Sequence, residues 1–452
     1  MYKFGNYFKN MLKMLTWRNF SWFMILTALF FGFQHTDLVH TFSSSYAYIN
    51  GHFSDFYDYN KKYIGGNDYL PVIYLIFAFW NLPLYFLNLI PSVEFIGPVR
   101  LPIQIFWSKL LLVVFFVASA KVLSLIAREL VSSDSAAKNR PIALLFASSP
   151  IVVLVIFAFG HYDILGVFFV LAGYYFYIKK DMWKFVLLFS MAISFKYFAF
   201  VIFLPLLLMV EKNPIKILKW LLIVGLPFLI QIFLYSHSDI FLGEIFTLLK
   251  GKAIGSNQDR ISFSKPNVYM LALYGLGCAY LYFKKYNSDS SWHRDAIFVP
   301  IIAYGLMFSA VVWHPQWMVI TMPFFALSYI YIRNTKWLAY VDTLASVLLV
   351  WIIVNVWANN LDMNMLQNGL MAQFIPSLTH QGSDFLVRKP VKLFGIIFNL
   401  YLFSPAIIYL FEVCLQGNRK RMKYEDLSEK LIAIRFIVAP GLFLMLALLS
   451  IS

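Results

Sequence analysis

Residues 71–90 read PVIYLIFAFWNLPLYFLNLI, and their relation to the membrane decides the topology of the whole chain. The run is apolar and long enough to cross a bilayer, which takes about 20 residues. Pro83, Asn81 and Asn88 weaken that interpretation. If the run crosses, every loop that follows it changes side, so the distribution of charge along the rest of the chain decides between the two topologies.

The composition of the chain predicts an all-α, polytopic membrane protein. Hydrophobic residues make up 61% of the sequence and charged residues 13%, whereas soluble domains average about 45–50% and about 25%. The net charge is +15, but the basic residues lie in loops rather than in a separate basic domain. The charge therefore indicates membrane orientation and not nucleic-acid binding. Cys278 and Cys414 lack the spacing of a metal site, and the basic N-terminus leads into a first span without a cleavage site.

Long apolar runs predict about 13 transmembrane helices. They lie near 18–34, 103–126, 141–159, 163–179, 183–195, 197–210, 217–235, 267–283, 296–313, 316–332, 337–357, 391–414 and 431–451. The fifth and sixth runs are short, and we expect them to form a helical hairpin interrupted at Lys196.

The positive-inside rule places residues 71–90 outside. When this run does not cross, most of the 37 Lys and Arg residues fall on the inner side, as the rule requires. We therefore predict an inner N-terminus, an outer C-terminus and a long first outer loop, residues 35–102. Residues 71–90 then form membrane-skimming helices within that loop.

Five separate segments place polar or ionisable groups at the outer ends of the predicted helices. They are HTD at 35–37, GHYD at 160–163, Lys196, the segment 251–267 with Arg260 and Lys265, and WHPQW at 313–317. Ionisable groups at membrane depth are costly and are usually functional. Simpler explanations remain open, since Asp37 could cap a helix and Lys196 could extend its ammonium to the interface.

The combination of these groups indicates a chemistry. A carboxylate can act as a general base, cations can hold phosphate, and aromatic rings such as Tyr69 and Trp317 bind sugars. The candidate base is Asp37, and the candidate substrate-binding residues are Lys196, His314, Gln316, Trp317, His161, Asp163, Arg260, Lys265 and Tyr69. We find no metal cluster, nucleophile elbow or nucleotide-binding motif and expect no cofactor.

At these positions the chain resembles the GT-C superfamily of integral-membrane glycosyltransferases. Within the superfamily it is most similar to the mannosyltransferase of glycosylphosphatidylinositol synthesis and its bacterial relatives. The resembling segments are HTDLVHTFSSSYAYINGHFSDFYDYN, YLPVIYLIFAFW, FGHYDILGVFFVLAGYYF, SFKYFAFVIFLPLLL and WHPQWMVITMPFF, in this order between residues 35 and 325.

The resemblance implies a polyprenyl- or dolichyl-phosphate sugar as donor and inversion at the anomeric carbon. It implies that Asp37 is the catalytic base, although Val39 stands where many members carry a second acid. The SPQY-like segment of relatives falls on 314–317 and their GQxD-like turn on 160–163, and Lys196 matches a lysine of relatives. It also implies a catalytic module at 1–330 and a variable C-terminal module at 331–452.

We therefore expect transfer of a sugar from a polyprenyl-phosphate donor to a hydroxyl of a glycan or glycolipid on the outer face. One alternative is a polysaccharide polymerase or O-antigen-ligase-like enzyme, which would use the late outer loop 358–390 with His380 and Arg388. Another is a lipid-linked sugar flippase or transporter, which would need charges along a path through the bilayer. An abundance of Lys, Asn and Phe favours a bacterial plasma membrane, and a eukaryotic protein would lie in the endoplasmic reticulum.

Overall fold

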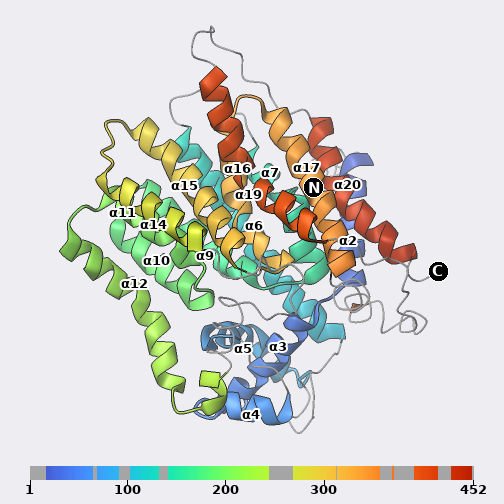
Figure 1. Cartoon of the computed structure of the whole chain (residues 1–452). Helices are drawn as coiled ribbons and strands as arrows, with labels where there is room; N and C mark the ends of the chain where they lie inside the picture. The colour runs from blue at the N-terminus through green and yellow to red at the C-terminus, as the bar shows by residue number, and fades with distance from the viewer. Residues whose placement is uncertain are drawn as a thin grey trace, which may run out of the picture.

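The computed structural model describes residues 17–64, 69–90, 102–131, 141–243, 268–311, 313–356, 369–370, 391–415 and 429–449. All regular secondary structure in these residues is helical (Figure 1). The prediction of an all-α chain is therefore confirmed for the described residues.

Most predicted apolar runs form one helix each. These helices are α2 (Trp17–Gly32), α6 (Pro102–Leu130), α9 (Asp163–Ile178), α10 (Met182–Phe195), α11 (Ala199–Val210), α12 (Pro214–Tyr235), α14 (Val268–Phe283), α15 (Asp289–Ala310), α17 (Thr335–Val356), α19 (Val391–Leu415) and α20 (Glu429–Leu449). The hairpin is interrupted as expected, because α10 ends at Phe195 and α11 begins at Ala199.

Two runs that we expected to be continuous are broken. The run 141–159 forms α7 (Ile142–Ala147), α8 (Pro150–Val153) and the π-helix η2 (Leu154–Phe159). The run 316–332 forms the 3₁₀ helix η3 (Pro315–Ile320) and α16 (Met322–Ser328). In both runs the second segment has a proline as its first or second residue. Proline lacks a backbone N–H, which is tolerated in the first turn of a helix but would remove a hydrogen bond from the middle of a continuous one.

The described helices include segments that are long and apolar enough to cross a membrane. α6 and α12 meet this condition, and α2 together with α3 (Thr36–Ile49) forms a pair bent by 60° that has the length of either a broken span or a re-entrant loop. Apolar side chains of α12, such as Ile215 and Phe233, are exposed along its length, as expected for contact with lipid. The chain is thus a membrane protein by its helices, and the number of about 13 spans stays a prediction.

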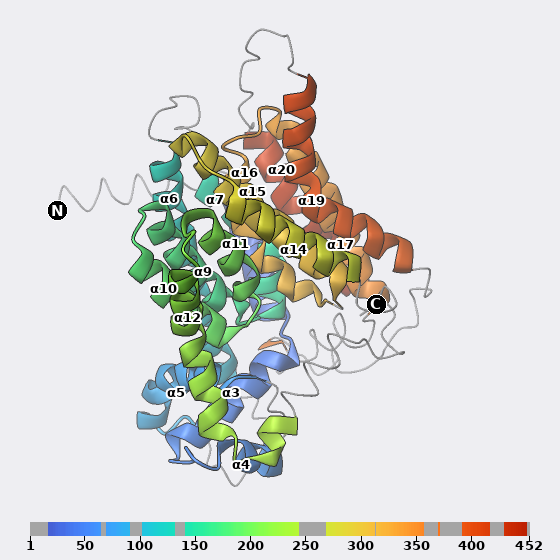
Figure 2. The same cartoon turned by 60° about the vertical axis from the view of Figure 1, so that its left-hand side comes forward.

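Residues of the first predicted outer loop fold into a separate group of helices. α3, α4 (Phe56–Tyr63) and α5 (Pro71–Phe86) lie together at the bottom of the molecule in Figures 1 and 2, next to the end of α12. Aromatic rings hold the group together, and the Tyr48 and Tyr235 hydroxyls lie 2.7 Å apart. α5 exposes Phe79 and Phe86. The placement of α5 against a membrane surface stays a prediction, and this apolar face supports it.

The remaining helices pack around α9 and around α17. α9 packs on α6 and α10, and α17 packs on α19 and α20. A buried ion pair between Arg435 of α20 and Asp342 of α17 ties the C-terminal helices together, with Tyr401 also donating to Asp342 at 2.5 Å. Arg435 reaches α7 as well, donating to Leu145 O at 2.7 Å.

Candidate functional site

Asp37 lies in the first turn of α3, just after a break in the chain. α2 ends at Gly32, and the backbone N–H of His35 donates to Phe159 O at 3.0 Å. The side chain of His35 then caps α3, because its Nδ1 accepts the backbone N–H of Asp37 at 3.2 Å. We expected Asp37 to end the first span. It instead lies at the beginning of the next helix, where the helix dipole stabilises a carboxylate.

The turn GHYD packs against this break. Gly160 ends η2 with a φ of 65°, in the left-handed region that favours glycine. A Cβ atom at this position would lie 2.8 Å from Gln34 Oε1. Glycine thus allows the turn to fit beneath Gln34, and the turn directs His161 towards Asp37.

His161 lies between two carboxylates. Its Nε2 is 3.5 Å from Asp37 Oδ2, and its Nδ1 is 3.4 Å from both Asp163 Oδ1 and the Asp163 backbone nitrogen. If Nδ1 accepts that backbone N–H, the proton of a neutral ring is on Nε2 and faces Asp37. Burial lowers the pKa of His161, but the Asp163 and Asp37 carboxylates outweigh it, so its pKa is raised above the usual value.

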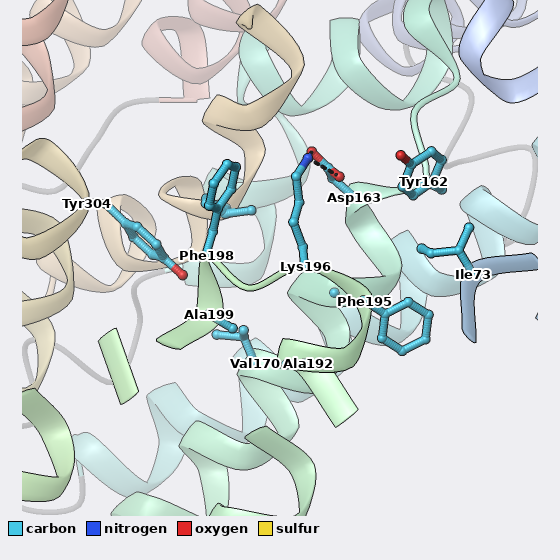
Figure 3. A pocket seen from close by; sticks show the side chains of 12 residues that line it. Ile73, Tyr162, Asp163, Val170, Ala192, Phe195, Lys196, Phe198, Ala199 and Tyr304 are labelled. Carbon is cyan, nitrogen blue, oxygen red and sulfur yellow. Dashed lines mark hydrogen bonds and ion pairs between the residues drawn. The ribbon is translucent and has the colours of Figure 1, made fainter. Parts of the chain in front are cut away.

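Lys196 pairs with Asp163. Its Nζ lies 2.7 Å from both carboxylate oxygens of Asp163, as the dashed lines in Figure 3 show. The ammonium also lies 4.9 Å from the ring centre of Trp317 and 5.3 Å from that of Phe198. Burial in this apolar surrounding lowers the pKa of Lys196, although Asp163 opposes the shift.

Beside this ion pair is a small pocket. Its walls are mainly apolar and come from α5, α9, α10, α11, α15 and η3. Figure 3 shows Lys196 and Asp163 on this pocket, with Tyr162 on one side and Phe198 and Tyr304 on the other. The pocket therefore presents an ion pair, the Lys196 ammonium together with the Asp163 carboxylate.

Aromatic side chains surround the two acids. Tyr69 donates its hydroxyl to Asp37 Oδ2 at 3.3 Å, and its ring contacts Tyr162 edge-on at 4.9 Å. Tyr57 donates to the backbone oxygen of Tyr69 at 2.8 Å and so fixes that segment. The side chain of Asp37 is 27% exposed and that of Asp163 is 1% exposed, so Asp37 is the accessible carboxylate of the two.

The structure brings together most of the predicted site residues. Asp37, Tyr69, His161, Asp163, Lys196 and Trp317 form one continuous set of contacts. His314 extends the set, since its ring centre lies 5.1 Å from that of Trp317, and Gln316 is buried in the same turn. Arg260 and Lys265 lie outside the described residues.

Lys109 is a residue that the sequence interpretation missed. Its buried Nζ donates to the backbone oxygens of Phe33 at 2.8 Å and Phe157 at 2.9 Å, and also to that of Phe30. It thereby joins α6 to the end of α2 and to η2, the two segments that closely precede His35 and His161. A cation inside the apolar run 103–126 was the available signal, because such charges are rarely without a role.

No group of three or more His, Cys, Asp or Glu side chains within the described ranges is arranged to hold a metal ion. Comparison with models of known protein families finds no match, and comparison with curated proteins finds none. The functional argument therefore rests on the geometry of the site and on the sequence motifs.

Proposed function

We propose that the chain is a GT-C-type glycosyltransferase that uses a polyprenyl-phosphate-linked sugar on the outer face of a membrane. The observation that carries the proposal is the accessible carboxylate of Asp37, linked through His161 and Asp163 to the cation of Lys196. A base and a phosphate-binding cation must both be present for this reaction, and three sequence segments bring them together.

In this proposal Asp37 is the general base. The hydroxyl oxygen of the acceptor attacks the anomeric carbon while Asp37 takes the hydroxyl proton. The bond between the anomeric carbon and the phosphate oxygen breaks, and the lipid phosphate leaves with the electron pair. Tyr69 and His161 each lie beside Asp37 Oδ2 and hold the carboxylate in one orientation, which is the requirement for efficient proton transfer.

Lys196 is assigned to the phosphate. Negative charge grows on the leaving oxygen, and a fixed cation beside it stabilises the transition state. Asp163 accepts from the ammonium when no substrate is bound and holds it at the pocket. The rings of Trp317 and Phe198 form an apolar environment on one side of the ammonium. In such an environment the attraction of the ammonium to a phosphate is stronger than in water.

The transporter alternative receives less support from the buried charges. Lys109 is held by backbone oxygens, and Asp342 and Arg435 are paired with each other. These described groups belong to contacts between helices. The polymerase alternative depends on loop 358–390, of which only 369–370 is described.

The test is the substitution Asp37→Asn, with Asp58→Asn as the matched control because Asp58 is an exposed acid of the same loop. Purified Asp37→Asn should fold like the wild type but transfer sugar from a polyprenyl-phosphate donor at least ~100-fold more slowly, the scale of a lost general base. Asp58→Asn should keep its activity.

A donor comparison completes the test. The wild type should use no nucleotide sugar when polyprenyl phosphate is absent. Normal turnover by Asp37→Asn would remove Asp37 from the mechanism, and robust transfer from a nucleotide sugar alone would overturn the assignment of the donor.

A further inference from the structure

A wide groove lies away from the candidate site, on the surface formed by α14, α15 and α19. Its volume is about 470 Å³, and it is open to the outside. This volume lies within the range of about 300–1,000 Å³ of pockets that hold small organic ligands. Its walls are mostly apolar and include Leu273, Ile302, Leu306 and Leu410.

One end of the groove carries a charged cluster. Lys284 Nζ lies 2.7 Å from Asp295 Oδ2, and Arg294 donates its Nε to Asp295 Oδ1 at 2.8 Å. Two cations thus share a single carboxylate, which leaves a net positive charge. Lys284 and Arg294 are partly exposed and line the groove together with Tyr409.

The position of this cluster indicates the inner leaflet. It adjoins the turn between α14 and α15, at the opposite end of the molecule from α3, α4 and α5 in Figures 1 and 2. The positive-inside pattern assigns this turn, which also carries Lys285, to the cytoplasmic side. Anionic lipids are enriched in that leaflet, and basic pockets between membrane helices bind their headgroups.

We propose that this groove binds an anionic phospholipid of the inner leaflet. The phosphodiester headgroup contacts Lys284 and Arg294, and an acyl chain lies along the apolar walls. Charge complementarity selects the occupant, because a zwitterionic lipid would bring a second cation to a cluster that already carries excess positive charge. The site is independent of the proposed transfer reaction, since none of its residues contacts Asp37 or Lys196.

A glycine pair on α14 allows a matched test of the apolar part. Gly277 lines the groove and Gly275 does not. A Cβ at either position would meet no atom within 4 Å, so a side chain can begin at either position without a clash at its first atom. Gly277→Phe should fill the groove, whereas Gly275→Phe adds the same ring to the same helix outside it.

The headgroup part has its own variant and control. Lys284→Gln with Arg294→Gln removes the two cations while leaving the apolar walls. Lys216→Gln removes an exposed cation of α12, which the charge pattern also places on the inner side but which does not line the groove.

The experiment measures equilibrium binding of radiolabelled dioleoyl phosphatidylglycerol to the full-length protein in mixed micelles, with labelled dioleoyl phosphatidylcholine in parallel. We expect saturable binding of phosphatidylglycerol at least ~10-fold tighter than that of phosphatidylcholine. The double Gln variant and Gly277→Phe should each weaken it ~10-fold or more, and Gly275→Phe and Lys216→Gln should not change it. Circular dichroism on each variant verifies that the helices are intact.

Three results would overturn the proposal. Equal binding of the two lipids would exclude a headgroup site for anionic lipid. Unchanged phosphatidylglycerol binding in both groove variants would place the lipid elsewhere. A wild-type dimer in light scattering that becomes a monomer with Gly277→Phe would show that a second copy of the chain occupies the groove instead.

Discussion

The pairing of Lys196 with Asp163 changes how the role of Lys196 must be tested. Asp163 is almost fully buried, so removal of the ammonium leaves an uncompensated charge inside the protein. Breaking a buried pair in this way costs about 3–5 kcal/mol, whereas replacing both partners with neutral groups costs much less. A loss of activity in Lys196→Ala alone would therefore not separate catalysis from folding.

The double variant Lys196→Met/Asp163→Asn separates them. We expect Lys196→Ala to unfold at a clearly lower temperature than the wild type and the double variant to recover most of that loss. Transfer from the lipid-phosphate donor should remain at least ~100-fold reduced in both, because no cation stabilises the leaving phosphate. Thermal unfolding and donor kinetics on the same preparations measure the two effects, and recovery of transfer in the double variant would leave Lys196 a structural role only.

At this scale the sequence predicted the residues but not their partners. Asp37, His161, Asp163 and Lys196 stand in short motifs at the predicted ends of helices, and a polar group there is conspicuous in an apolar chain. The contact between Asp163 and Lys196 depends on how α9 packs on α10. No periodicity within a single segment contains that information.

At the scale of helices, Lys109 holds three helical segments in place. Its ammonium satisfies backbone oxygens at the end of α2 and in η2, where the helix breaks leave carbonyl groups without their usual donors. Each buried carbonyl that loses its partner costs about 1–3 kcal/mol. His35 and His161 closely follow these two segments, so the loss should affect the site.

We predict that Lys109→Met lowers both the unfolding temperature and kcat, the latter at least ~10-fold. Lys121→Met is the control, since Lys121 is an exposed cation of the same helix. Circular dichroism during heating and steady-state transfer kinetics measure the two quantities. A Lys109→Met protein with wild-type stability and kcat would show that other groups satisfy these oxygens and that α6 does not position the site.

Helix positions could be predicted because each apolar run needs its backbone hydrogen bonds satisfied locally. The breaks within 141–159 and 316–332 were missed, although Pro150, Pro315 and Pro323 lie in or beside these runs. Hydropathy averages over such prolines, because their effect is on one hydrogen bond and not on polarity. The π-helix η2 ends at Gly160, where a Cβ would meet Gln34, and only the folded chain shows this proximity.

At the scale of the whole molecule, both proposals depend on which side of the membrane each loop faces. The proposed reaction requires the Asp37 site and α4 to lie on the outer face, and the lipid groove requires the turn after α14 to lie on the inner face. Both orientations follow from the prediction that residues 71–90 do not cross the membrane. The described helix α5 has 16 residues, the same length as α9 and α14, so the charge of the later loops and not the length of α5 supports this prediction.

Cysteine accessibility in intact cells or oriented vesicles tests the topology. After replacement of Cys278 and Cys414, Ser288→Cys and Asp134→Cys should react only from the inner side. Asp58→Cys should react from the outer side, and so should cysteines at 258 and 370. Outer labelling of Asp134→Cys would mean that residues 71–90 cross, and the single outer-face site would then be wrong.

The ammonium of Lys109 also bears on how the chain is assembled during its synthesis. α6 enters the membrane with a cation as its eighth residue, and a lysine in a membrane helix opposes insertion. One of its acceptors, Phe157 O, is 48 residues further along the chain. The acceptors at Phe30 and Phe33 precede α6, so the set of acceptors for this ammonium is completed only when the third hydrophobic run has followed the second out of the ribosome.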